Sequence, residues 1–369
     1  KEHGKAGNKA KYEWYKKRQL VQKILLNSLY GVLGLPAFRF YDVDNATAVT
    51  TTGQTVIKST ADMANIKYNK ELGDSTLDSN IYIDTDSVFF SAVPLLDKRI
   101  PNWKDNEQDT IAGFVNDIAE EMQDYLNGFY DILSQKVFNV DKDKHRFEIK
   151  KEYVSKSGIW IAKKRYAQWI ISDNGVPVDK LDVKGLDVVR SSYPAAFRKF
   201  MSEVLIDILK GNTESELTDK IYDFKNGLSK MNVVDIAKNT SVKNLTKYLP
   251  KGRQERMFQF KSATPAHVKA AIAFNQLLSH YKCEMKYEPM KNGDKVKWVY
   301  LKQNPLGLDG VAFKGYDDPK EIMELINTYI DYDKIFEREL LKKLEDFYNA
   351  MDWGEVLSST KTAEKFFSF

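Results

Sequence analysis

One stretch decides how this chain folds: Asn80-Ile81-Tyr82-Ile83-Asp84-Thr85-Asp86-Ser87-Val88-Phe89-Phe90. Its polar middle is typical of a turn, and strong β-formers flank it on both sides, so it predicts a hairpin over residues 79–92. Asp84 and Asp86 are two residues apart, and an extended backbone would point both carboxylates to one side. We expect Ile83 and Val88 to bury the flanks. Paired carboxylates suit a hard cation such as Mg²⁺, although an exposed Asp-rich turn is the alternative.

A helix is predicted N-terminal to the hairpin, over residues 12–33, because apolar residues recur there near the 3.6-residue period. Lys23, Asn27 and Tyr30 stand at i, i+4 and i+7 and therefore share one face. Gly31 leaves room for a close backbone approach. A cation, an amide and an aromatic hydroxyl beside such a gap suit a triphosphate and its base pair. A surface stripe on an amphipathic helix is the alternative.

The remaining pattern mixes helices and strands, which predicts an α+β fold with an antiparallel sheet backed by helices and a mostly helical second part. Strands are expected at 38–43 and 145–171 and at 295–301. Helices are expected at 44–70, 110–139, 186–232, 265–282 and, as a pair, 318–350.

A basic and aromatic run, Lys163-Lys164-Arg165-Tyr166, lies inside the expected strands. In a strand, Lys164 and Tyr166 would face one side, and Lys163 and Arg165 the other. Cations interleaved with an aromatic ring can hold a phosphate backbone and pack a sugar. The alternative is a basic edge strand that guards against aggregation.

Composition sets the wider limits. The 369 residues are 43 % hydrophobic with a net charge of only +4, but Lys and Arg gather in residues 1–23 and 142–165, as on a directed binding surface. A pair of solvated charged faces is the alternative. The single cysteine, Cys283, excludes an intramolecular disulfide framework. We expect no membrane helix and no signal peptide. The chain does not begin with Met, so we interpret Lys1 as an internal start.

Four motifs in one order resemble family B DNA polymerases. Lys23 to Gly31 resembles motif B, Tyr82 to Ser87 resembles motif C, and Lys163 to Tyr166 resembles the basic motif of the palm. Lys184-Gly185-Leu186-Asp187 resembles the motif at the palm–thumb junction, with Asp187 where many relatives carry Glu. The resemblance covers essentially the whole chain and is strongest to the replicative polymerases of T-even-type phages.

This resemblance implies roles for individual residues. Lys23 and Asn27 would contact the incoming dNTP, and Tyr30 and Gly31 would line the nascent base pair. Asp86 would bind the catalytic metals directly, with Asp84 beside it and two Mg²⁺ ions in the complete enzyme. The side chains expected to hold primer-template DNA are Lys163, Lys164, Arg165, Tyr166 and Lys184.

The departures from the family pattern are as informative as the motifs that match it. Motif A, which supplies a further metal-binding Asp, should precede motif B, and nothing before Lys23 matches it. Asp187 to Pro194 imitates motif A, but its spacing and position are wrong. The proofreading exonuclease region is also absent. We therefore expect an inactive or weak chain that needs an N-terminal polymerase portion; a non-catalytic DNA-binding or clamp-tethering fragment is the alternative.

The expected organisation is a fingers remnant at 1–34, a palm at 35–186, a thumb at 187–358 and a tail at 359–369. The tail ends in Phe366, Phe367 and Phe369, and related phage polymerases end in a similar aromatic peptide that docks a sliding clamp. A tail packed on its own domain is the alternative. The resemblance implies a cytoplasmic enzyme of an infected bacterial cell.

Overall fold

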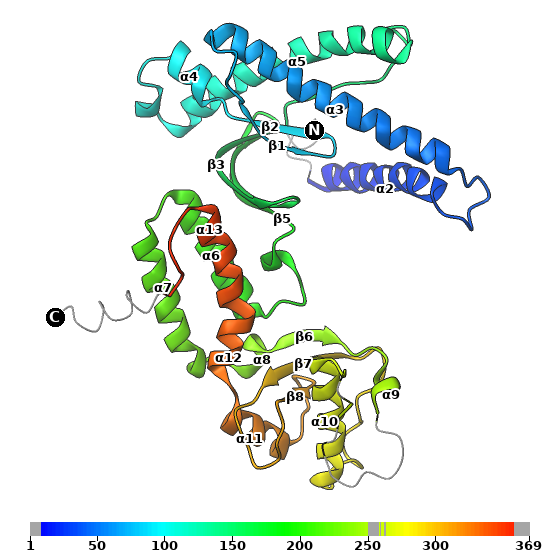
Figure 1. Ribbon diagram of the computed structural model, residues 1–369, viewed down its shortest axis with the longest axis vertical. Helices are drawn as coiled ribbons and strands as arrows, with labels where there is room; N and C mark the ends of the chain where they lie inside the picture. The colour runs from blue at the N-terminus through cyan, green and yellow to red at the C-terminus, as the bar shows by residue number, and fades with distance from the viewer. Residues whose placement is uncertain (1–8, 250–257, 259, 262, 358–369) are drawn as a thin grey trace, which may run out of the picture. The chain divides into compact units, whose positions relative to one another are not determined.

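A computed structural model describes residues 9–249, 258, 260, 261 and 263–357. The chain divides into two compact units, Lys1–Glu152 and Tyr153–Phe369, which we describe separately (Figure 1). The described residues form three antiparallel sheets among many helices, which confirms the predicted α+β class. The division into fingers, palm and thumb stays a prediction. Among the described residues, no helix combines the length and the apolar character needed to cross a membrane.

The first unit is mainly helical, with one hairpin (Figure 1). Two long helices come first and the hairpin and two further helices follow: α2 (Lys9–Leu33), α3 (Val43–Leu72), β1 (Asn80–Asp84), β2 (Ser87–Phe90), α4 (Val93–Arg99) and α5 (Gln108–Phe138). Asp42 caps α3 by accepting a hydrogen bond from the Asn45 amide at 3.0 Å. These elements confirm the predicted helices at 12–33, 44–70 and 110–139 and the predicted hairpin.

The core of the first unit lies between the C-terminal half of α3 and the helices α4 and α5. Its buried side chains are Ala64, Tyr68, Leu95, Leu96, Ile118, Met122 and Leu126. Arg99 joins two of these helices, since its guanidinium forms ion pairs with Glu71 at 2.6 Å and Glu121 at 2.8 Å. The hairpin and α2 therefore extend from a core to which α2 contributes no buried residue.

In the first unit, the strand predicted at 38–43 is wrong, and the strand region predicted at 145–171 is wrong over residues 145–152 but confirmed from Tyr153 onward. Residues 38–43 form turns, because the amides of Phe38, Tyr41 and Asp42 bond to carbonyls only three to nine residues earlier. The predicted strand region 145–171 begins as a strand only at Tyr153.

Side chains take the place of a neighbouring strand in residues 145–152. The amides of Phe147, Ile149 and Lys151 donate to His145 Nδ1 at 3.1 Å, Asn127 Oδ1 at 2.9 Å and Gln123 Oε1 at 2.9 Å. These alternate amides are the ones that a ladder would use. The segment is therefore extended along α5 without belonging to a sheet.

The second unit contains two three-stranded sheets and most of the helices. One sheet has the order β3-β4-β5, from Tyr153–Ala162, Arg165–Asp173 and Val176–Lys184. The other has the order β6-β7-β8, from Lys238–Ser241, Lys295–Tyr300 and Gly310–Phe313. The helices are α6 (Ala195–Lys210), α7 (Glu214–Gly227), α8 (Val233–Ile236), α9 (Leu245–Tyr248), α10 (Ala266–His280), α11 (Lys320–Tyr329), α12 (Tyr332–Phe336) and α13 (Lys342–Ala350).

A single large core joins these elements. Helix α6 packs on β3 and β4, α13 packs on β3, and α10 covers β7 and β8 (Figure 1). Aromatic side chains fill the centre, and the rings of Phe200 and Phe224 stack with their centroids 4.0 Å apart. A π-helix at Glu337–Leu341 connects α12 to α13, so one nearly continuous helical segment passes from one sheet to the other. This segment carries α13 to the end of the β3-β4-β5 sheet.

Candidate functional site

The hairpin turn of the first unit holds the predicted carboxylates. Asp84 pairs with Ser87 across it, and the Asp86 amide donates to the Asp84 carbonyl at 2.6 Å. This tight closure forces Thr85 to a φ of +58°, which is unfavourable for a β-branched residue. Such strain costs about 1–3 kcal/mol and tends to gather at functional sites. The turn therefore holds its two acids in a conformation that the local sequence does not favour.

The geometry differs from the extended strand assumed above. Because Thr85 is left-handed, strand alternation does not decide where Asp84 and Asp86 point. Asp84 is half-buried and accepts from Thr85 Oγ1 at 3.1 Å, whereas Asp86 is exposed. The expectation that Ile83 buries one flank is wrong, since Ile83 is 37 % exposed. Tyr82 and Phe89, whose rings lie 6.1 Å apart, support the hairpin instead.

These two carboxylates fit part of a magnesium site. Oxygen ligands at the tip of a rigid hairpin are the donors that Mg²⁺ takes from proteins. Over the described part of the chain, no three side chains among His, Cys, Asp and Glu gather closely enough to hold a metal ion. Asp84 and Asp86 are therefore the two carboxylates that the described hairpin offers to a metal ion, and their role as ligands stays a prediction.

Helix α2 carries the predicted nucleotide-binding residues on one face. Lys23 and Asn27 are exposed, Tyr30 is 41 % exposed, and a Cβ at Gly31 would meet nothing within 4 Å. The face is thus open in the way that an incoming triphosphate and base pair would need. No described contact tests these four assignments, and they stay predictions.

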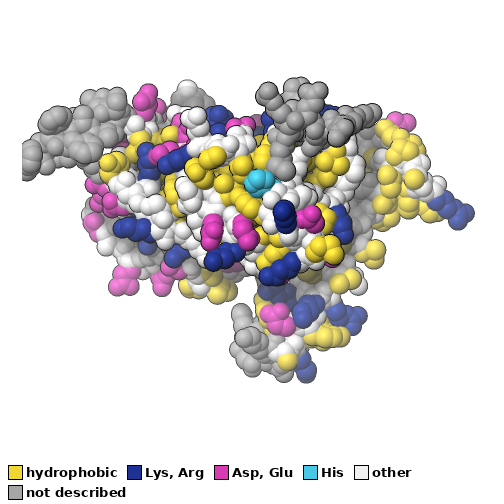
Figure 2. All heavy atoms as spheres, turned by 90° about the horizontal axis from the view of Figure 1, so that it is seen from below, with side chains coloured by type: hydrophobic (Ala, Val, Ile, Leu, Met, Phe, Trp, Pro, Cys, Tyr) yellow, Lys and Arg dark blue, Asp and Glu magenta, His cyan; other side chains and the backbone are white. Residues whose placement is uncertain are grey.

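A second face of α2 is apolar and also open. Val21, Leu25 and Leu29 follow one another at intervals of four residues and are 65 %, 69 % and 58 % exposed. Figure 2 shows hydrophobic side chains on the surface at the right of the view, where α2 and α3 of the first unit lie. An apolar stripe of this length on a long helix normally marks an interaction surface.

The basic motif of the second unit is a hairpin turn rather than continuous strand. Ala162 pairs with Arg165, so Lys163 and Lys164 form the two-residue connection between β3 and β4. Lys164 has a φ of +60°. The predicted alternation of these side chains is therefore replaced by a turn that projects both lysines, which are exposed.

Arg165 and Tyr166 lie on the protein side of this turn. Arg165 forms an ion pair with Asp346 of α13 at 2.8 Å. Tyr166 is only 4 % exposed, and its ring stacks on Trp160 with centroids 6.3 Å apart. A DNA contact by Tyr166 would thus be restricted to its edge, and its assignment as a DNA ligand stays a prediction.

The palm–thumb motif lies beside the basic turn, because Lys184 of β5 pairs with Tyr166 of β4. Lys184 Nζ is 3.0 Å from Asp182. Asp187 receives a hydrogen bond from Lys343 at 2.7 Å and an ion pair from Arg190 at 2.9 Å. Burial alone would raise the pKa of Asp187, but the hydrogen bond from Lys343 and the surrounding cations outweigh it and lower the pKa.

The predicted residues thus fall into two groups. The first unit holds Asp84, Asp86 and the open face of α2, and the second holds the basic turn with Lys184. Phe366, Phe367 and Phe369 lie outside the described residues. Sequence reasoning missed the two α13 side chains, Asp346 and Lys343. They stand more than 150 positions from their partners, and no local pattern marks them.

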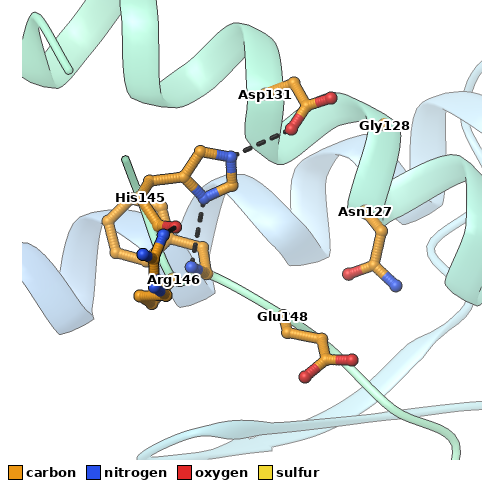
Figure 3. A pocket seen from close by; sticks show the side chains of 7 residues that line it. Asn127, Gly128, Asp131, His145, Arg146 and Glu148 are labelled. Atoms are coloured by element: carbon orange, nitrogen blue, oxygen red, sulfur yellow. Dashed lines mark hydrogen bonds and ion pairs between the residues drawn. The ribbon is translucent and has the colours of Figure 1, made fainter. Parts of the chain in front are cut away.

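A pocket of about 510 Å³ lies elsewhere in the first unit, and none of the residues that line it is a predicted site residue (Figure 3). The His145 ring lies in it, with Nδ1 accepting from the Phe147 amide at 3.1 Å. Nε2 therefore carries the proton and donates to Asp131 at 2.9 Å. Both ring nitrogens are thus engaged, and His145 fastens the 145–152 segment to α5.

Comparison with known proteins places this geometry in context. The sequence profile of DNA polymerase family B matches residues 2–98 and 117–351. The DNA-directed DNA polymerase of Enterobacteria phage T4 is 29 % identical over 356 residues, which cover 92 % of this chain and 38 % of the phage protein. The corresponding enzyme of Escherichia phage RB69 is 28 % identical over 349 residues, covering 90 % and 37 %. A DNA polymerase of Thermococcus gorgonarius is 28 % identical over 216 residues, covering 58 % and 22 %. The chain thus spans less than two fifths of the length of these relatives.

Proposed function

This chain belongs to DNA polymerase family B, as its four motifs predict, and we propose that it is the C-terminal catalytic portion of a DNA-directed DNA polymerase. The reaction would be attack of a primer 3′-hydroxyl on the α-phosphate of a dNTP. The observation that carries the proposal is the strained turn at Thr85, which presents Asp84 and Asp86 within a chain of this family. The fingers remnant would be 1–34, the palm 35–186, the thumb 187–358 and the tail 359–369.

The hairpin acids would bind the metal ions of nucleotidyl transfer. Two Mg²⁺ ions, when bound, would neutralise phosphate charge and activate the attacking hydroxyl. Asp86, which is exposed at the turn, would be a direct ligand. Asp84, which is half-buried and accepts from the Thr85 hydroxyl, would fix the orientation of the turn and ligate less directly.

The open face of α2 would receive the incoming dNTP. Lys23 would neutralise phosphate charge as a compact cation, and Asn27 would donate hydrogen bonds from the next turn of the helix. Tyr30 and Gly31 would lie against the nascent base pair, where the absence of a side chain at Gly31 leaves space for it. Positioning of this kind supplies much of the catalysis in phosphoryl transfer.

The second unit would hold primer-template DNA through phosphates. Lys163 and Lys164 project from the β3–β4 turn, and Lys184 stands beside them on β5. Contacts with phosphate carry no sequence information, so binding should be insensitive to sequence and strongly dependent on salt.

We infer that activity needs a further polypeptide segment that carries motif A and the exonuclease region. Two observations support this inference. The described acids do not complete a metal site, and the apolar stripe of Val21, Leu25 and Leu29 is open to a partner. The 369-residue chain alone should therefore extend primers little or not at all. The complete enzyme would act in the cytoplasm of an infected bacterial cell.

A mixing experiment tests the proposal. The chain is combined with a polypeptide that carries motif A, and dNTP incorporation on a primed template is measured with and without Mg²⁺. Incorporation should appear in the mixture, require Mg²⁺ and disappear with Asp86→Ala. Equal incorporation with Asp86→Ala would refute the metal assignment, and robust extension by the chain alone would refute its incompleteness.

The second candidate is a non-catalytic fragment that binds DNA or tethers it to a sliding clamp. It is favoured by the contrast between exposed lysines at the β3–β4 turn and an incomplete acid set in the first unit. In that case the mixture would remain inactive while salt-sensitive DNA binding persisted. Removal of residues 359–369 would then weaken binding to a clamp but leave binding to DNA unchanged.

A further inference from the structure

Gly185 lies directly against the backbone of the basic turn. It follows Lys184, the last residue of β5 paired with β4, and has a φ of +66°. A Cβ at Gly185 would lie 1.9 Å from the Lys164 carbonyl oxygen and 3.1 Å from its carbonyl carbon. Both atoms belong to the backbone, so no rotation of a flexible side chain can relieve the overlap. Only a residue without a side chain allows this approach.

The turn itself depends on support from outside its own sequence. Lys164 occupies the left-handed region at a φ of +60°, which non-glycine residues adopt at a cost. Lys-Lys is not among the residue pairs that favour two-residue hairpin turns. On one side Arg165 is fastened to Asp346 at 2.8 Å. On the other side, the peptide group that follows Lys164 rests on Gly185.

We propose that Gly185 is a positioning residue for DNA binding: its bare α-carbon seats the Lys164 carbonyl and thereby fixes how Lys163 and Lys164 approach the phosphate backbone. The inference rests on the proposed function of the turn. It predicts that Gly185, which has no side chain to contact DNA, nevertheless has a measurable effect on DNA affinity.

The same sheet provides a matched control. Gly175, in the turn between β4 and β5, has a φ of +78°, and a Cβ there would meet nothing within 4 Å. Alanine at either glycine introduces left-handed strain. Of the two substitutions, only alanine at Gly185 also displaces the Lys164 carbonyl. The difference between the two variants therefore isolates the displacement of the turn.

The experiment measures binding of the full chain to a short primer-template duplex by fluorescence anisotropy over a range of salt concentrations. Gly175→Ala should bind within about 2-fold of the wild type. Gly185→Ala should bind about 10-fold more weakly, and the slope of log affinity against log salt should become shallower by roughly one phosphate contact. In a Lys164→Ala background, Gly185→Ala should add less than about 2-fold, because the contact that it perturbs is already gone.

The outcomes distinguish a failure of the proposed DNA-binding function of the turn from a failure of the positioning role of Gly185. If Lys164→Ala binds DNA like the wild type, the proposed function of the turn fails. If Lys164→Ala weakens binding but Gly185→Ala matches Gly175→Ala in affinity and slope, the positioning role fails. Full additivity of Gly185→Ala and Lys164→Ala also overturns it.

A second measurement covers the case in which Gly185→Ala does not fold. Amide hydrogen exchange of the wild-type chain is followed with and without DNA. The amides of Arg165 and Gly185 should slow together when DNA binds, since the turn and its seat act as one unit. Slowing at Arg165 without any change at Gly185 would overturn the proposal.

Discussion

Removal of two leucine side chains from the apolar stripe of α2 should weaken assembly without unfolding the chain. The perturbation is the double variant Leu25→Ala with Leu29→Ala. Leu25 is 69 % exposed and Leu29 is 58 % exposed, so most of each side chain is still available for burial by a partner. Complete burial of a leucine is worth roughly 1.5–3 kcal/mol. The exposed portions therefore correspond to about 1–2 kcal/mol each, or roughly a hundred-fold in Kd for the pair.

The stability of the isolated chain should hardly change, because exposed substitutions usually shift the free energy of unfolding by less than about 0.5 kcal/mol. Alanine also favours helix at least as well as leucine. The assay is titration of the chain with a polypeptide that carries motif A, followed by calorimetry, with urea unfolding of each variant alone.

A matched control lies on α5, where Ile132 and Val137 are 52 % and 56 % exposed. Alanine at both removes similar apolar area from another helix of the same unit and should leave the Kd unchanged. The reasoning is wrong if the α2 variant binds its partner as tightly as the wild type. It is also wrong if the α5 variant loses affinity to the same extent, or if the α2 variant loses its stability in isolation.

Three further outcomes follow from the described contacts. Thr85→Gly should raise the unfolding free energy by up to about 1 kcal/mol, because it relieves the left-handed strain. It should nevertheless lower primer extension by the assembled enzyme, because a more flexible turn holds Asp84 and Asp86 less firmly. A loss of stability in urea would contradict this prediction. Asp346→Asn releases Arg165 from its 2.8 Å ion pair and so removes one support of the turn that carries Lys163 and Lys164, which should weaken DNA binding about 2- to 5-fold; unchanged anisotropy would count against it. Asp187 has a lowered pKa, with burial opposed by the Lys343 hydrogen bond and nearby cations, so its contribution to stability is present above the ordinary pKa of 3.8 and is lost as pH falls below it. The difference in unfolding free energy between wild type and Asp187→Asn should therefore be constant above about pH 5 and shrink in more acidic solution, and urea titrations at several pH values measure it.

Periodicity predicted the long helices and the acid-bearing hairpin, because each is determined by residues close together in sequence. The 145–152 segment was not predictable in the same way. Its residues alternate as in a strand, but its backbone amides donate hydrogen bonds to the side chains of Gln123 and Asn127 of α5 instead of to a neighbouring strand. A side chain more than twenty positions away cannot be read from a local pattern.

The basic motif illustrates a different limit. The residue types at Lys163 and Lys164 indicated phosphate binding, but their backbone geometry was predicted as extended strand. Two lysines are not a typical turn pair, and the residues that contact the turn from outside, Gly185 and Asp346, lie on other elements of the unit. The sequence thus indicated the residue types of the proposed DNA-binding site, whose role stays a prediction, but it did not indicate the turn geometry that presents them.

In the first unit, the residues with predicted functional roles lie on the elements that contribute fewest side chains to the core. The core gathers on the C-terminal half of α3 and on α4 and α5, whereas the predicted nucleotide-binding face of α2 and the strained turn at Thr85 lie at its margin. Elements with few buried contacts open most readily. A partner that buried the stripe of Val21, Leu25 and Leu29 would stabilise α2, by an amount that rises with the logarithm of the partner concentration above its Kd. Under the proposed function, the segment that supplies the further acid would thus also rigidify the helix that receives the dNTP, and a chain without that segment would lack both a metal ligand and an ordered nucleotide-binding face.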